Sequence, residues 1–319
     1  LQNADCILFL GTRNNIRQVS YNWENFAPKA YKIMVDIDNA ELEKPLVKPD
    51  LAINADMKYF LPALAEQIIP LETFYWLKWC QKLKEKYNFA HTAEYQQTGD
   101  KINAYYFLHR LNQLLANNDV CVLANATATI CTFQTAEIKS GQRIFSNSGD
   151  ASMGYDLPAA IGACVANNRK NTICIAGDGS IMMNLQELQT IKHNKLPVKI
   201  FIINNDGYIS IKQTQNRFFE GRHCGDGKES GVSMPDFIKI GEAFAIKSVR
   251  LDKPQEIDAT INNVLSTDEP IICEVMVDAD YIFTPKLSAR TLPDGSMVSP
   301  SLEDMYPFLP REEYEENLL

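Results

Sequence analysis

The 319-residue chain has no apolar run of the roughly 20 residues that a helix needs to cross a bilayer, and no signal peptide opens it. Basic residues are few, because 31 Lys and Arg stand against 40 Asp and Glu, which gives a net charge of −9. The eight cysteines form no CxxC pair, and no histidine lies at ligand spacing from them. We therefore expect a cytoplasmic protein with reduced thiols and with neither nucleic acid nor a membrane as a partner.

Hydrophobic residues make up 45% of the chain and charged residues 22%, which is ordinary for a protein that buries a core. Short apolar runs alternate with segments of helical periodicity, the pattern of an α/β protein with a parallel sheet covered on both faces. The strands are expected at residues 6–10, 30–38, 51–56, 120–124, 172–176, 198–203 and 270–277. No GxGxxG follows any of these strands, which argues against a nicotinamide dehydrogenase.

The composition divides the chain into four parts. Residues 1–70 read as half of a Rossmann-like domain, because three strands with about one helix per gap leave an open sheet edge. Residues 71–100 are expected to form a linker, residues 101–280 a doubly wound parallel sheet, and residues 281–319 an irregular C-terminal arm. We expect from this that the chain begins inside a domain.

One strand end has the composition of a phosphate site. The apolar run 172–176 continues into Gly177-Asp178-Gly179 and then into Ser180. In a parallel sheet such a turn lies at the carboxyl end of the strands, where ligands bind, and glycines let the backbone approach a phosphate. A carboxylate at Asp178 would be a hard oxygen ligand suited to Mg²⁺ beside a diphosphate.

The next apolar strand, residues 198–203, ends in a matching set of oxygen donors. Asn205 supplies an amide oxygen and Gly207 a backbone carbonyl. With Asp178, two phosphate oxygens and a water they would complete an octahedral Mg²⁺ site. The alternative is that the two segments are ordinary turns between strands and helices.

Gly177-Asp178-Gly179 followed by Asn204-Asn205 resembles the signature of thiamine-diphosphate enzymes. The segment 148–163 resembles the aminopyrimidine-binding stretch of the acetolactate synthase branch. Gly11-Thr12-Arg13 and residues 35–38 resemble the second half of that family's central, FAD- or nucleotide-binding domain. The resemblance implies that residues 101–280 are the thiamine-diphosphate-binding domain.

The resemblance also assigns roles to individual residues. Asp178, Asn205 and the carbonyl of Gly207 would bind Mg²⁺. Met153 would be the apolar wedge that bends the cofactor, and the backbones of Ala151 and Met153 would bond its pyrimidine. The diphosphate would contact Gly177, Gly179 and Ser180 in the turn after the strand 172–176. It would also contact Asn125 and Thr127 in a second loop at residues 125–129.

The activity that the resemblance implies is decarboxylation of a 2-oxo acid such as pyruvate, followed by carboligation. The family takes its essential glutamate from a pyrimidine-binding domain, and no segment here corresponds to that domain. Glu187 is the local candidate, and a structural role in a helix is the stronger interpretation for it. We therefore predict no catalytic residue in this chain and no turnover by the chain alone. The partner would be another copy in a homodimer or tetramer, or a chain that carries the missing domain.

The substrate segment departs from the family. Ser210, Ile211 and Thr214 are the candidate pocket residues, and Thr214 stands where acetolactate synthases that prefer 2-oxobutyrate carry a tryptophan. Losing that wall enlarges or polarises the acceptor site. A carboligase for a larger acceptor such as a keto-sugar, a simple 2-oxo acid decarboxylase and a non-catalytic binding subunit therefore remain alternatives, and so does FAD as an additional cofactor.

Overall fold

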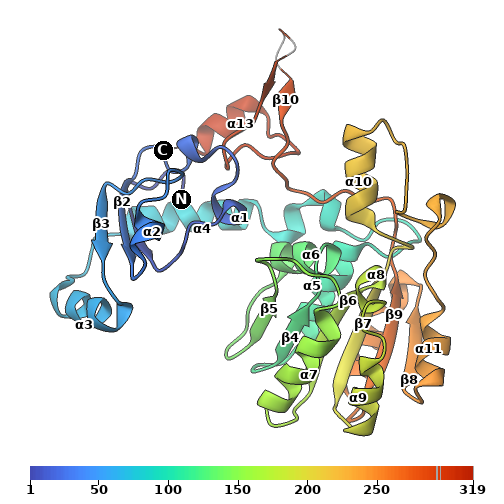
Figure 1. The fold of residues 1–319 in the computed structure, drawn as a ribbon. Coiled ribbons are helices and arrows are strands. Elements are labelled where there is room, and N and C mark those ends of the chain that lie inside the picture. The colour runs from blue at the N-terminus through green and yellow to red at the C-terminus, as the bar shows by residue number, and fades with distance from the viewer. Residues whose placement is uncertain (292–293, 295, 319) are drawn as a thin grey trace. The chain divides into compact units, whose positions relative to one another are not determined.

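A computed structural model describes residues 1–291, 294 and 296–318 of the chain (Figure 1). The chain folds into two compact units, one made of residues 1–86 and 284–319 and the other of residues 87–283. Among the described residues, no helix combines the length and apolar character needed to cross a membrane.

The first unit is built on a three-stranded parallel sheet in the order β1-β2-β3. The strands are β1 (Cys6–Leu10), β2 (Tyr31–Asp36) and β3 (Leu51–Asn54), which confirms the three strands predicted in this part of the chain. Its helices are α1 (Ile16–Val19), α2 (Asn39–Leu42), α3 (Met57–Gln67) and α4 (Phe74–Lys86).

The C-terminal segment belongs to this first unit. It contains β10 (Arg290–Thr291), which pairs antiparallel with β11 (Met297–Val298), and the short helix α13 (Arg311–Glu316). The amide of Gln2 donates to the Glu303 carboxylate at 2.8 Å, and Lys86 forms an ion pair with Glu313 at 2.9 Å. The described residues of this segment therefore pack as part of a folded unit.

The second unit contains a six-stranded sheet, all parallel, in the order β5-β4-β6-β7-β9-β8. The strands are β4 (Val120–Leu123), β5 (Arg143–Ser146), β6 (Thr172–Gly177), β7 (Val198–Asn204), β8 (Lys247–Leu251) and β9 (Ile271–Met276). From β4 the chain first moves outward to β5 and then returns to the other side of β4 to form β6. The order in which strands are added therefore reverses between β4 and β6, and ligands bind at such a point in open α/β sheets.

Helices cover both faces of this sheet (Figure 1). Strand residues of alternate parity enter two separate cores, as expected for buried parallel strands. Cys121, Leu123 and Phe201 belong to the core with α5 (Ala104–Leu114), α6 (Thr127–Thr135) and α12 (Ile257–Leu265). On the other face lie α7 (Asp156–Ala166), α9 (Glu187–His193) and α11 (Phe237–Ala243), whose core includes Val122, Cys174 and Ile200. The doubly wound architecture predicted from the sequence is confirmed.

Two short helices complete the second unit at the carboxyl ends of its strands. They are α8 (Asp178–Ile181), directly after β6, and α10 (Ile209–Phe218), shortly after β7. Helix α9 begins at Glu187, ten residues after β6 ends. Residues before it form turns, and the Asn184 side chain is bonded to the carbonyl of Gly154 at 2.6 Å.

Candidate functional site

The carboxyl ends of three adjacent strands bring the predicted site residues together. β6 and β7 pair in parallel with Gly177 opposite Ile203, so Asp178 and Asn205 follow neighbouring strand ends. β4 pairs on the other side of β6 and leads into the loop that begins with Asn125. The two predicted motifs and the second loop therefore share one edge of the sheet, at the point where the strand order reverses.

The carboxylate of Asp178 is buried at the centre of this edge. Its Oδ1 accepts a hydrogen bond from the backbone N–H of Gly179 at 2.7 Å. Its Oδ2 accepts from the N–H groups of Asn205 at 3.1 Å and Gly207 at 3.0 Å. A carboxylate has about four acceptor positions, so one position on Oδ1 remains for a further partner.

Burial is the main reason that the pKa of Asp178 rises to about 6. The three backbone N–H groups act in the opposite direction and favour the charged form, while the charge of Asp206 raises the pKa further. A cation bound at Asp178 would remove most of this penalty, because it would neutralise the buried charge.

The side chain of Asn205 presents an acceptor without a partner. Its Oδ1 is buried and has no hydrogen bond to any group in the part of the chain that the structure describes. The Nδ2 group lies 3.5 Å from both the Thr127 hydroxyl and the Tyr281 hydroxyl. An unsatisfied buried acceptor costs stability unless another group binds it.

Gly207 occupies a conformation and a space that only glycine can use. Its φ is +141°, and a Cβ there would lie 2.2 Å from the carbonyl oxygen of Asp226. The N–H of Tyr208 donates to that same carbonyl at 2.8 Å, and Gly207 forms an antiparallel bridge to Gly227. The loop that contains Asp226 therefore holds the turn after β7 in place.

These donors fit a hard divalent cation. A buried carboxylate with a remaining acceptor position and an unpartnered amide oxygen are typical ligands of Mg²⁺, which normally completes its shell with phosphate oxygens and water. Within residues 1–291, 294 and 296–318 no group of three or more His, Cys, Asp or Glu side chains could hold a metal ion. The donor set thus suits a metal shared with a phosphate ligand better than a site made wholly of protein side chains.

The turn after β6 is built more tightly than the sequence suggests. A Cβ on Gly179 would lie 2.2 Å from the ring of Tyr208, so this glycine makes room for an aromatic side chain, and its N–H is bonded to Asp178. The hydroxyl of Ser180 donates to the buried carboxylate of Asp156. Burial raises the pKa of Asp156.

Hydrogen bonds tie the predicted pyrimidine segment to the same edge. The N–H of Gly154 donates to the Ser180 hydroxyl at 2.9 Å, and the carbonyl of Gly154 accepts from the Asn184 side chain. These bonds fix the residue that follows Met153. The Asn125 side chain donates to the carbonyl of Ala151 at 3.1 Å and so connects the loop after β4 to this segment.

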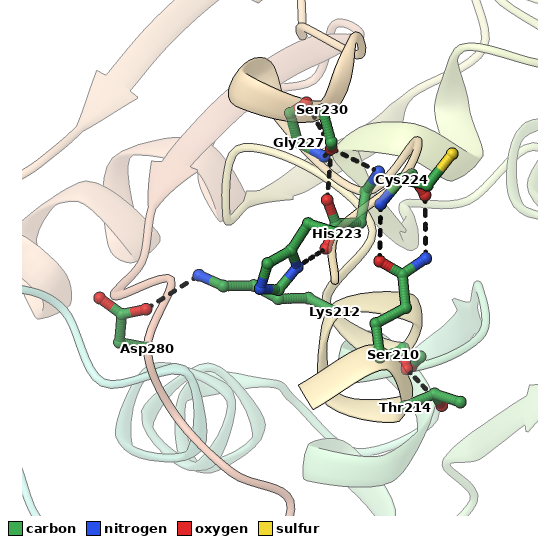
Figure 2. A network of polar contacts seen from close by, with 10 residues as sticks. Ser210, Lys212, Thr214, His223, Cys224, Gly227, Ser230 and Asp280 are labelled. Atoms are coloured by element: carbon green, nitrogen blue, oxygen red, sulfur yellow. Dashed lines mark hydrogen bonds and ion pairs between the residues drawn. The ribbon is translucent and has the colours of Figure 1, made fainter. Parts of the chain in front are cut away.

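Beside the turn after β7 lies a cavity of about 590 Å³, within the usual range for small-molecule sites. Its wall is polar and apolar in about equal parts, and its lining includes Asn205, Gly207, Tyr208, Lys212, His223, Asp226, Lys228 and Ser230. Figure 2 shows the contacts that order this wall. His223 Nδ1 lies 2.5 Å from the Asp226 carboxylate, which also accepts from Ser230, and Lys212 forms an ion pair with Asp280 at 2.9 Å.

The three predicted substrate residues lie elsewhere on α10. Ser210, Ile211 and Thr214 are exposed, and none of them is among the residues that line the cavity. The Thr214 hydroxyl donates to the carbonyl of Ser210 at 2.9 Å (Figure 2). Their assignment to a substrate pocket stays a prediction, while Lys212 of the same helix does line the cavity.

Sequence reasoning missed four residues of this site: Asp156, Asn184, Asp226 and Tyr281. Asp156 had a local signal, because it is a lone acid at the start of the apolar helix α7. The other three act through contacts with residues far away in the sequence, so periodicity and spacing give no sign of them.

In the first unit, Gly11, Arg13 and Asp36 line a separate cavity of about 580 Å³ at the carboxyl ends of its strands. Asp38, Glu41 and Asp56 line it too, and Arg13 is already paired with Glu41 at 3.0 Å. Four carboxyl groups against one engaged arginine do not suit the diphosphate of a dinucleotide such as FAD.

Comparison with known proteins identifies both units. Residues 1–64 match the family described as thiamine pyrophosphate enzyme, central domain, and residues 125–275 match thiamine pyrophosphate enzyme, C-terminal TPP binding domain. Thiamine pyrophosphate and thiamine diphosphate are the same compound.

Individual relatives agree with these matches. The acetolactate synthase isozyme 2 large subunit of Escherichia coli is 31% identical over 278 residues, which are 87% of this chain and 48% of the relative. Acetolactate synthase 1, chloroplastic, of Zea mays is 32% identical over 285 residues, 87% of this chain and 44% of the relative. The chain therefore spans about half the length of the curated relatives it matches. It belongs to the thiamine pyrophosphate enzyme family and resembles its acetolactate synthase large subunits.

Proposed function

We propose that the second unit binds thiamine diphosphate through Mg²⁺ at the carboxyl ends of β4, β6 and β7. The observation that carries the proposal is the unpartnered, buried Oδ1 of Asn205 next to the buried carboxylate of Asp178. Asp178, Asn205 and the carbonyl of Gly207 would hold the metal. The backbone around Gly177 and Ser180 and the loop with Asn125 and Thr127 would lie along the diphosphate.

The remaining residues of the site would orient the cofactor and exclude water. Met153 would support the bent cofactor, with the backbone of Ala151 at its pyrimidine. When bound, thiamine diphosphate supplies an electron sink for the carbanion that forms when a 2-oxo acid loses CO₂. The protein contributes binding and orientation, which the hydrogen bonds on Gly154 and Asp178 would stabilise.

We propose a 2-oxo acid decarboxylase and carboligase as the overall activity, with pyruvate as the substrate. The names of the relatives support this assignment. The resemblance assigns the activating glutamate to a pyrimidine-binding domain, whereas the two family matches here are to a central and a C-terminal domain. Turnover would then need that domain, whether a second copy in a dimer or tetramer or another chain supplies it.

A larger, polar acceptor such as a keto-sugar is the second candidate. The cavity beside Gly207 supports it, because charged groups of both signs and a hydroxyl line its wall. A polar acceptor could form hydrogen bonds with this wall, whereas a short aliphatic acceptor could form none and would gain less from it.

Calorimetric titration of thiamine diphosphate into the chain, with Mg²⁺ and again with EDTA, tests the proposed function. We expect saturable binding that disappears with EDTA, since the metal links the diphosphate to Asp178 and Asn205. Equal binding in both buffers would contradict the metal site. If neither buffer gives binding, the same titration on a chain joined to a pyrimidine-binding domain decides whether the site needs that domain.

The raised pKa of Asp178 predicts how metal affinity depends on pH. Since a proton and a cation compete for one carboxylate, affinity should fall below pH 6, by about tenfold per pH unit, and level off above it. Because the pKa of Asp178 is raised, metal affinity begins to fall at a higher pH than it would for an ordinary aspartate. Water-proton relaxation with Mn²⁺ alone measures the affinity without interference from a titrating phosphate. Asp178→Asn serves as the control and should abolish the dependence, and a wild-type affinity that stays constant down to pH 4.5 would argue against the prediction.

A further inference from the structure

The amide of Asn205 can serve a cation in only one of its two orientations. Its oxygen is a ligand for Mg²⁺, whereas its NH₂ group is a donor that would repel the metal. In the structure Oδ1 is the buried atom without a partner among the described residues, and Nδ2 faces the hydroxyls of Thr127 and Tyr281, 3.5 Å from each. What surrounds Nδ2 therefore decides whether the oxygen is available.

The two hydroxyls form a small acceptor pair. The Thr127 and Tyr281 hydroxyls are hydrogen-bonded to each other, so one hydrogen is used between them and lone pairs of both oxygens remain to accept from Nδ2. Burial raises the pKa of Tyr281, which keeps its hydroxyl protonated at neutral pH. An amide turned the other way would direct both NH₂ hydrogens away from these acceptors, and its oxygen could accept only the one hydroxyl hydrogen that the pair leaves over.

The position of Tyr281 is itself fixed. Its ring packs edge-on against Phe283, with ring centroids 5.7 Å apart, and its carbonyl accepts from the Gln213 side chain at 3.0 Å. The neighbouring Asp280 forms an ion pair with Lys212 of α10, as Figure 2 shows. Lys212 and Gln213 are adjacent residues of α10, so this helix holds the segment that carries the tyrosine.

We propose that Tyr281 is a positioning residue for the metal site: together with Thr127, its hydroxyl engages Nδ2 of Asn205 and thereby directs Oδ1 toward the cation. The inference rests on the proposed function. Tyr281 lies outside residues 125–275, which match the family's C-terminal domain, so the match assigns it no role. Groups that orient a metal ligand in this way typically account for 10- to 100-fold in metal affinity.

Tyr281→Phe tests the proposal by removing a single oxygen atom. We expect the Kd for Mn²⁺, measured by titration in the presence of thiamine diphosphate, to rise about tenfold or more. Tyr106→Phe on α5 is the matched control, because it removes a hydroxyl from the same unit without touching Asn205, and it should leave the Kd unchanged. Thr127→Val tests the other half of the pair and replaces Tyr281→Phe if that variant does not fold; because Thr127 is also a proposed diphosphate contact, its Kd is measured with Mn²⁺ alone.

A second background separates orientation from a general structural effect. In Asn205→Asp both ends of the side chain are oxygens, so no group is needed to orient them. Tyr281→Phe should then cost less than about threefold when it is added to the Asn205→Asp variant, a non-additivity that reports coupling between the two residues. Equal losses in both backgrounds would mean that Tyr281 only supports the fold, and would overturn the proposal.

The outcomes also distinguish this inference from the proposed function. If Tyr281→Phe binds Mn²⁺ like the parent chain while Asp178→Ala does not bind it, the positioning role is wrong and the metal site stands. If both variants bind like the parent chain, the metal site itself is wrong.

Discussion

Replacement of Asp178 by alanine is expected to abolish Mg²⁺-dependent binding of thiamine diphosphate. The variant keeps only neutral donors at the site, the amide of Asn205 and the backbone carbonyl of Gly207. Loss of a group outside the first ligand shell already costs 10- to 100-fold in metal affinity, so loss of the charged ligand should exceed about 100-fold. Calorimetry with and without EDTA measures the effect.

Asp206→Asn is the matched control for this variant. Like Asp178→Ala, it removes one carboxylate, in this case from the turn after β7. Asparagine tolerates the positive φ of 58° found there. It should reduce affinity only slightly. Because Asp178 also accepts three backbone hydrogen bonds, circular dichroism must show that the Asp178→Ala variant is folded. A folded variant with parental affinity in both buffers would refute the assignment of Asp178 as a ligand.

Gly207→Ala should disrupt the same site through the backbone. The added Cβ would lie 2.2 Å from the Asp226 carbonyl oxygen, at a φ of +141° that side chains rarely adopt. The turn must move, and its movement displaces both the Gly207 carbonyl and Asn205. We expect the free energy of unfolding of the second unit to fall by about 2–4 kcal/mol and metal affinity to fall more than tenfold.

Gly225→Ala separates the steric clash from the strain of a left-handed backbone. Gly225 has a φ of +66°, but a Cβ added to it would meet no atom within 4 Å, so only the conformational cost of about 1 kcal/mol applies. Chemical denaturation and Mn²⁺ titration of both variants give the comparison. Equal effects of the two substitutions would show that the contact with Asp226 is unimportant.

In the six-stranded sheet, the sequence predicts the strands that are buried on both faces. β4, β6, β7 and β9 are buried along almost their whole length, so they read as apolar runs, which a single charged residue interrupts in β7 (Lys199) and in β9 (Glu274). The sequence does not predict the edge strands β5 (RIFS) and β8 (KSVRL), because they contain few apolar residues in a row and are mostly half-buried or exposed. An edge strand has a partner on one side only, and its sequence shows less of the apolar pattern.

The candidate site divides in the same way. Asp178, Asn205 and Gly207 follow apolar strands directly, so position in the chain suffices to bring them to one edge. Asp226 and Tyr281 reach the site from a loop and from the segment after β9, and no local pattern links them to β7. Packing also changes the explanation for the glycine at position 179. The sequence suggests that Gly179 lets a phosphate approach, whereas the structure shows the Tyr208 ring packed against it.

The hydroxyl pair of Thr127 and Tyr281 joins residues 154 positions apart in the chain. Since the polypeptide is synthesised from its N-terminus, this part of the site can close only after the chain has been made as far as Tyr281. Cofactor then binds the finished sheet and not its earlier intermediates, so it stabilises the folded state by mass action, by about 2.7 kcal/mol at a concentration 100 times the Kd. The supply of cofactor would accordingly set how long the finished unit survives unfolding and proteolysis, while leaving the speed of its assembly unchanged.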